Sequence, residues 1–339
     1  MSDALLLQND KARIVDTRTM DWADPLPQEP LHGVPGAKVK VLARFPGGEP
    51  RVQLMYVPPG IDNLNPAGVA ERHYHRTVRE WVYILSGEMP FREYEYPDQQ
   101  VGNLVHYRTG MFLDRLPGEG SAHGLDPGNG GTVGCVCLEW KTGPGTAISE
   151  KGSDKETVVV TEEQVHAAKA PAARPSTVTS GPGIAYRTPS VTIYDTLTMQ
   201  WHVPGPGEPF HGTGAKVKVL ARDEEGHVLA QSLWFPPGSD SMGHGGRPER
   251  HYHKTVHEWV YVLDGEAAIR EYGHDESGPG VRVDFRAGVF LEREPGPGAF
   301  HGVDASAPSP VGFHCLEWRI GRGSAAGEAG TGEENVVVH

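Results

Sequence analysis

The chain has 339 residues, three cysteines and a formal net charge of −13. This acidic balance, without a basic patch, excludes a typical nucleic-acid-binding protein, and no stretch is long and apolar enough to cross a membrane. The first ten residues lack the basic and apolar regions of a secretion signal, and the odd cysteine count favours reduced thiols, so we expect a cytoplasmic protein.

Short runs rich in β-branched and aromatic residues, separated by glycine and proline turns, fill the first half of the chain. They lie at residues 39–42, 52–57, 81–85, 91–96, 111–113 and 134–140. The run at 81–85 ends at Ser86-Gly87, a dipeptide typical of turns. No long window shows the 3.6-residue apolar period of a helix. The sequence therefore predicts an all-β sandwich or barrel.

The same pattern returns in the second half of the chain. Residues 249–266 match residues 71–88 at all but four of eighteen positions, with an offset of 178. The match extends from residues 36–44, which return as 214–222, to residues 156–160, which return as 334–338 and predict a strand at the C-terminal end. Such a sustained repeat predicts two domains. We place an N-terminal domain at residues 13–163, a linker at 164–190 and a C-terminal domain at 191–339.

Each repeat carries three histidines and one glutamate at fixed spacing. The two sets are His73, His75, Glu80 and His123, and His251, His253, Glu258 and His301. Alternate residues of a strand share a face, so each His-x-His pair points one way, and the glutamate begins the next strand. The four side chains meet only if their strands curve around a common interior. The sets predict about two divalent metal ions per chain, the alternative being a barrel that keeps the residues without a working site.

Nitrogen and oxygen donors without a thiolate suit Fe(II), which we favour, and also Mn(II), Zn(II), Ni(II) and Cu(II). In an octahedral ion, four protein ligands leave two adjacent positions for a small oxygenated substrate. A guanidinium makes two parallel contacts with a carboxylate, so four arginines are candidate substrate contacts, with ordinary surface charge as the alternative. These are Arg92, Arg115, Arg270 and Arg293.

The pattern His-x-His-x4-Glu-x6-Gly, at residues 73–87 and 251–265, resembles the first signature of the cupin superfamily. The pattern Gly…Pro…Gly-x2-His, at residues 110–123 and 288–301, is similar to the second signature of the same superfamily. The resemblance covers nearly the whole chain. It implies a bicupin, a pair of tandem jelly-roll β-barrels that each hold a metal. One chain then contains the barrel pair that single cupins make by dimerising, so both a monomer and a homo-oligomer fit.

Cupins host many reactions, so the family does not by itself give the activity. Our leading interpretation is a non-haem iron dioxygenase that acts on a diketone, an aryl ketone or a catechol-like molecule. The order Gly-Ala-Lys-Val-Lys-Val-Leu, Pro-Pro-Gly, His-Tyr-His is similar to single-domain cupins that cleave carbon–carbon bonds in such ketones. One alternative is a redox-neutral manganese or zinc enzyme, such as an oxalate-type decarboxylase, a cyclase or an isomerase. Another is a non-catalytic sensor that binds a metal and a ligand.

Overall fold

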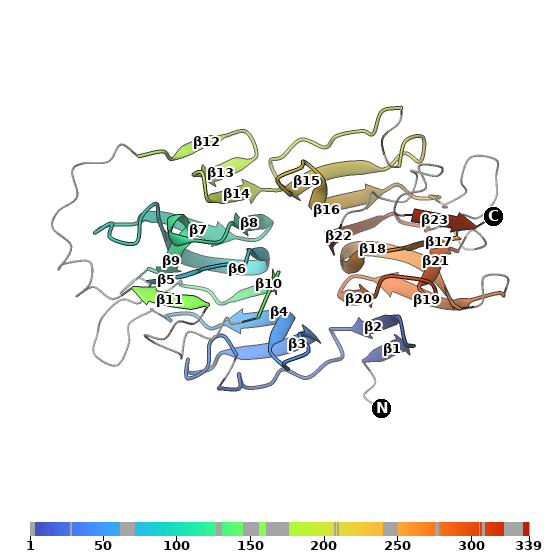
Figure 1. Cartoon of the computed structure of the whole chain (residues 1–339), viewed down its shortest axis with the longest axis horizontal. Helices are drawn as coiled ribbons and strands as arrows, with labels where there is room; N and C mark the ends of the chain where they lie inside the picture. Colours follow the sequence, from blue (N-terminus) through green and yellow to red (C-terminus); the bar gives the residue numbers. More distant parts are fainter. Residues whose placement is uncertain are drawn as a thin grey trace. The chain divides into compact units, whose positions relative to one another are not determined.

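The computed structural model describes residues 4–27, 29–61, 72–126, 131–144, 156–160, 176–206, 208, 210–239, 250–274, 278–304, 306, 309–321 and 335–338. Within these ranges the chain forms strands joined by turns, with one short 3-10 helix, η1 (Glu119–Ser121), and no α-helix (Figure 1). The all-β class predicted from the sequence is confirmed. The described residues contain no helix long and apolar enough to span a membrane.

The strands repeat in the two halves of the chain. The first half contains β1 (Leu5–Gln8), β2 (Ala12–Asp16), β3 (Lys38–Arg44), β4 (Pro50–Val57), β5 (Arg72–His75), β6 (Glu80–Tyr94), β7 (Asn103–Arg108), β8 (Met111–Arg115), β9 (Ala122–Leu125), β10 (Cys135–Lys141) and β11 (Thr157–Val160). The second half contains β12 (Thr179–Gly181), β13 (Ile184–Arg187), β14 (Val191–Asp195), β15 (Lys216–Arg222), β16 (Val228–Phe235), β17 (Arg250–His253), β18 (His257–Gly273), β19 (Val281–Arg286), β20 (Val289–Arg293), β21 (Phe300–Val303), β22 (Phe313–Ile320) and β23 (Asn335–Val338). The strand predicted at the C-terminal end is β23, which pairs with β17 as β11 pairs with β5.

The chain folds into two compact units that are not contiguous in sequence. One unit, here the N-terminal barrel, comprises residues 21–199, and the other, the C-terminal barrel, comprises residues 1–20 and 200–339. These limits differ from the predicted domains. Strand β2 pairs with β20 of the C-terminal barrel, and β14 pairs with β8 of the N-terminal barrel. Strands β12 and β13 extend that sheet from within the predicted linker, whose residues 164–175 lie outside the described residues.

Each of the two long strands, β6 and β18, pairs with different strands along its first and second parts. The first part of β6 pairs with β8 and β10, and its second part pairs with β7 and β9. The turn predicted at Ser86-Gly87 is instead a register shift within this one strand. Gly87 has φ 82°, and a Cβ there would lie 1.8 Å from the carbonyl oxygen of Gly134, so the position accepts only glycine. A close approach of backbones, rather than a chain reversal, explains this dipeptide.

Side chains alternate between the two faces of a strand, and on β6 both faces are buried. On β6, Trp81 stacks on Trp140 of β10 at 6.0 Å between ring centroids. The opposite face of the same strand carries Glu80, Val82 and Ile84, of which the two aliphatic residues join the apolar core of the N-terminal barrel. Glu80 therefore enters the barrel interior at the border of that core.

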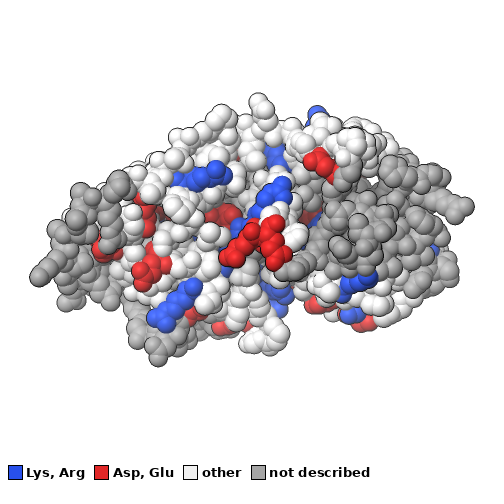
Figure 2. All heavy atoms as spheres, turned by 45° about the horizontal axis from the view of Figure 1, so that its top comes forward, with Lys and Arg blue, Asp and Glu red and all other residues white. Residues whose placement is uncertain are grey.

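At the surface shown in Figure 2, Lys and Arg side chains lie interspersed with Asp and Glu.

Asp16, at the end of β2, forms an ion pair with Arg286 of the C-terminal barrel. Substituting Asp16 therefore tests how strongly β2 is held in that barrel. Its carboxylate lies 3.0 Å from both Arg18 and Arg286, and the hydrogen bond from Arg18 is the main reason that its pKa falls from 3.8 to about 2. A lowered folded-state pKa gives stability that is complete above the unfolded value and lost as the pH falls through the folded value. We expect Asp16→Asn to cost about 1–2 kcal/mol of unfolding free energy at pH 7, because both arginines are half-exposed.

Urea unfolding of wild type and variant at several pH values measures this difference, which should shrink between pH 4 and pH 2. Asp284→Asn is the control, since Asp284 is 71% exposed and pairs with Arg282 on the surface. A cost for Asp16→Asn that stays constant down to pH 2 would contradict the ion-pair explanation.

Candidate metal centres

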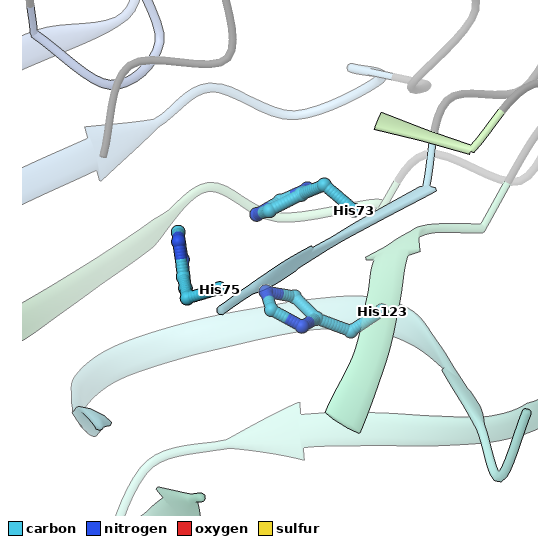
Figure 3. Close-up of side chains that lie close together, drawn as sticks. All are labelled: His73, His75 and His123. Atoms are coloured by element: carbon cyan, nitrogen blue, oxygen red, sulfur yellow. The ribbon is translucent and has the colours of Figure 1, made fainter. Parts of the chain in front are cut away.

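Three histidines meet inside the N-terminal barrel. His73 and His75 come from β5, and His123 comes from β9, where it lies opposite His73 in the strand pairing. The ring centroids of His73 and His123 are 4.3 Å apart, and one ring nitrogen of each histidine lies within 4.8 Å of the others. Figure 3 shows the three rings grouped around a common point. The spacing that alternation predicted on β5 therefore delivers both side chains to the same site.

Neighbouring groups hold these rings in the form that binds a metal. The Nδ1 of His123 lies 2.8 Å from the carbonyl oxygen of Ser121, which can only accept, so Nδ1 carries the proton and Nε2 offers its lone pair. The Nδ1 of His75 contacts the hydroxyl of Thr157 at 3.2 Å, and its Nε2 is buried without a hydrogen-bond partner. Burial, followed by the charge of His75, lowers the pKa of His73 to about 3. Burial also holds the pKa of His123 well below its usual value, so both rings are neutral at pH 7.

The C-terminal barrel repeats this arrangement. His251 lies opposite His301 in the pairing of β17 with β21, and their ring centroids are 4.2 Å apart. His253 completes the group, again with one nitrogen of each ring within 4.8 Å of the others. The Nδ1 of His301 donates to the carbonyl oxygen of Ala299 at 2.8 Å, and burial lowers the pKa of His251 to about 3.

The predicted glutamates lie beside both clusters. In the N-terminal barrel, Glu80 Oε1 is 3.6 Å from His75 Nε2, and Glu80 Oε2 is 3.4 Å from His123 Nε2. Burial alone would raise the pKa of Glu80, but the neighbouring His75 and His123 and the positive charges of Lys141 and Arg115 hold it well below its usual value. The carboxylate is therefore ionised at pH 7 although it is buried. In the C-terminal barrel, Glu258 lies 3.6 Å from His253 and 3.8 Å from His301.

Each site thus combines three imidazoles with one carboxylate. The Nε2 of His123 offers its lone pair to the centre, the Nε2 of His75 is buried without a hydrogen-bond partner, and Glu80 is ionised, as a metal ligand must be. The residues present therefore fit a divalent metal ion, as the sequence predicts.

The strand register explains why Glu80 stays charged. It lies opposite Arg115 on β8 and opposite Lys141 on β10, so a cation flanks it on either side. Arg115 Nη1 donates to Glu80 Oε2 at 2.8 Å, which leaves Oε1 facing His75. The predicted substrate contact Arg115 is 3% exposed and holds carboxylates of the protein itself. Its counterpart Arg293 likewise contacts Glu258 and Glu271.

The other two predicted arginines lie elsewhere. Arg92 contacts Asp126 at 2.5 Å and the carbonyl oxygen of Gly102 at 2.7 Å, and its side chain is 25% exposed. Arg270 contacts Asp304 at 2.9 Å and is 27% exposed. The structure therefore pairs both arginines with aspartates of their own barrel.

Several polar residues of the N-terminal barrel interior were not singled out from the sequence. Lys141 lies 2.7 Å from Glu139, which also accepts a hydrogen bond of 2.5 Å from Gln53. Glu93 lies opposite His123 in the strand pairing and is completely buried. Burial raises the pKa of Glu93 and of Glu139 above the usual value. Strand alternation could have identified two of them. Glu139 and Lys141 lie two and four residues after Cys137 on β10, so they share its inward face.

No protein-family description and no curated protein matches the chain by sequence. Solved structures do match its fold. A Nostoc punctiforme protein provisionally assigned as a dioxygenase gives a TM-score of 0.55 at 11% identity, covering 97% of this chain and 86% of its own. A Pseudomonas aeruginosa protein provisionally assigned as glyoxylate-induced gives 0.52 at 12% identity, covering 94% and 92% of the two chains. The Escherichia coli protein Ylba gives 0.50 at 8% identity, covering 95% and 96%. This likeness over nearly the whole length and the two repeated barrels, each with its histidine cluster, show that the chain has the tandem jelly-roll fold that the sequence predicts.

Proposed function

We propose that this protein is a metal-dependent enzyme that acts on a small oxygenated organic molecule, and more specifically that it is a non-haem iron dioxygenase. The observation that carries the proposal is the donor set of three imidazoles and one ionised carboxylate in each barrel interior. Nitrogen and oxygen donors favour Fe(II) and are also compatible with Mn(II), Zn(II), Ni(II) and Cu(II). Likeness to the Nostoc protein assigned as a dioxygenase supports the class.

A bound Fe(II) would supply Lewis acidity and electron exchange with O2. The residues of the chain prepare the place where that chemistry occurs. The carbonyl of Ser121 and the hydroxyl of Thr157 orient His123 and His75, so that their Nε2 atoms face the centre. Arg115 and Lys141 keep Glu80 ionised. Glu80 lies at the border of an apolar core that includes Met55, Val82, Ile84 and Cys137.

A redox-neutral manganese or zinc enzyme is the second candidate. The observation that favours it is the presence of two buried carboxyl groups, Glu93 and Glu139, whose pKa values are raised by burial. Carboxyl groups that hold a proton at higher pH serve as general acids or bases, which a decarboxylase, a cyclase or an isomerase needs. In this case the chain's own carboxyl groups would move the proton, and no oxygen would be consumed.

Oxygen consumption separates the two candidates. We expect the Fe(II)-loaded protein to consume O2 in proportion to a diketone, aryl ketone or catechol-like substrate, and to stop under argon. The test is an oxygen-electrode screen of these compounds and of oxalate, with substrate loss followed in parallel. Full turnover under argon, or activity with zinc alone, would contradict the dioxygenase and support the redox-neutral enzyme.

A further inference from the structure

A hydroxyl group beside the metal-site ion pairs is present in one barrel interior and absent from the other. Tyr107 on β7 lies in the N-terminal barrel, and the equivalent position on β19 of the C-terminal barrel is Phe285. Both side chains are buried, with 1% and 2% of their surface exposed. The phenol of Tyr107 enters the ion-pair network that holds the metal-site glutamate, and the phenyl ring of Phe285 has no group to do so.

In the N-terminal barrel this hydroxyl changes how arginine and glutamate meet. Tyr107 donates to Glu93 Oε1 and accepts from Arg115 Nη2 at 2.6 Å. Arg115 Nη2 also reaches Glu93 Oε1 at 2.8 Å, while Nη1 holds Glu80. Both contacts to Glu93 involve the same oxygen, Oε1. Glu93 Oε2 and Arg115 Nε are consequently buried without a hydrogen-bond partner.

In the C-terminal barrel, the equivalent arginine and glutamate contact each other at two points. Arg293 Nη2 donates to Glu271 Oε1 at 2.5 Å, and Arg293 Nε donates to Glu271 Oε2 at 3.4 Å. Both carboxylate oxygens are therefore used. Among the described residues, neither Arg293 nor Glu271 has a buried polar atom without a partner. The pair that lacks a neighbouring phenol thus makes the two-point contact that a guanidinium prefers.

A buried charged donor and a buried charged acceptor rarely remain unsatisfied in a folded protein, because water or a ligand completes them. A hydroxyl group is the chemical group that accepts from an N–H and donates to a carboxylate at the same time. Glu93 lies opposite His123 in the strand pairing, and Phe91, which stacks on Tyr107 at 4.8 Å, also stacks on His123 at 6.2 Å. The unsatisfied pair is therefore next to the histidine cluster.

We propose that Arg115 Nε and Glu93 Oε2 form a hydroxyl-binding subsite of the N-terminal barrel. Tyr107 creates the subsite by preventing Arg115 from contacting both oxygens of Glu93. The hydroxyl belongs either to a water molecule or to a hydroxylated substrate such as a hydroxy ketone or an enol, and the second source rests on the proposed function. A substrate with such a group would then bind in the N-terminal barrel in preference to the C-terminal barrel.

Crystal structures of the zinc-loaded wild type, Tyr107→Phe and Phe285→Tyr test the proposal. In the wild type we expect an oxygen atom within hydrogen-bond distance of both Glu93 Oε2 and Arg115 Nε. In Tyr107→Phe this atom should be lost, with Arg115 contacting both oxygens of Glu93 as Arg293 contacts Glu271. Phe285→Tyr should produce an oxygen atom at the equivalent place in the other barrel. If that larger side chain prevents folding, the Tyr107→Phe comparison still decides.

Crystals soaked with hydroxyacetone distinguish the two sources. A hydroxyacetone oxygen in the subsite assigns it to a substrate hydroxyl, and a retained water assigns it to water. In solution, calorimetry with hydroxyacetone should then show binding at least about tenfold weaker for Tyr107→Phe if the substrate source holds, because a hydrogen bond to charged groups is lost. Methoxyacetone, which cannot donate, is the control and should bind both proteins alike.

Two results would overturn the subsite. One is a wild-type Arg115 that contacts both oxygens of Glu93, and the other is a bridging oxygen that persists in Tyr107→Phe. Absence of zinc from the N-terminal barrel would instead contradict the proposed metal site, and the density beside Arg115 is read independently of it.

Discussion

Replacing His73 with alanine is expected to remove one metal ion from the protein and leave the other. The cluster in the N-terminal barrel has three imidazoles from two short strands, and the described residues offer no further imidazole within that group. Loss of one donor leaves an incomplete shell, whereas the C-terminal cluster keeps its own three. Metal content should fall from about two to about one ion per chain in His73→Ala and in His251→Ala, and to near zero in the double variant.

Elemental analysis after reconstitution with Fe(II) or Zn(II) and dialysis measures this content. His106→Ala is the matched control, since His106 is a half-exposed histidine of the same barrel that pairs with Glu88. It should keep the wild-type content. If either single ligand variant also keeps it, the corresponding cluster is not a metal site.

Arg115→Met should cost about 3–5 kcal/mol of unfolding free energy in metal-free protein. Removing this guanidinium leaves Glu80 and Glu93 buried without the cation that contacts both of them. Breaking a buried ion pair by removing one partner has a cost of this size, because the remaining charge stays out of water. Arg108→Met is the control. Arg108 is 62% exposed, pairs with Asp195, and should cost about 0–1 kcal/mol.

Urea unfolding with a chelator, and again with saturating zinc, measures both variants. Zinc beside Glu80 offsets its charge, so the loss caused by Arg115→Met should be smaller with zinc than without it. A loss below about 1 kcal/mol in the chelated protein would show that Arg115 does not stabilise the buried carboxylates.

The composition of the candidate site was predictable from the sequence because it depends on local rules. His73 and His75 share a face by strand alternation, and the repeat at an offset of 178 showed that each ligand has a counterpart. The same rules gave the all-β class and the last strand. The role of Arg115 was not predictable. The sequence gives no register between β6 and β8, and that pairing is what places its guanidinium against Glu80.

The repeat determined that the chain holds two equivalent barrels, but it could not determine which barrel each edge strand joins. Strands β8 and β20 are equivalent copies, so β2 and β14 meet almost the same pairing edge in either barrel. Only the tertiary structure decides that β2 pairs with β20 and β14 with β8. Likewise, both repeats predict a buried arginine–glutamate pair once the fold is known. Arg115 and Arg293 nevertheless make different contacts, and Arg115 also contacts the hydroxyl of Tyr107, which β7 places beside it. Long-range pairing fixes such contacts, and local sequence patterns do not encode it.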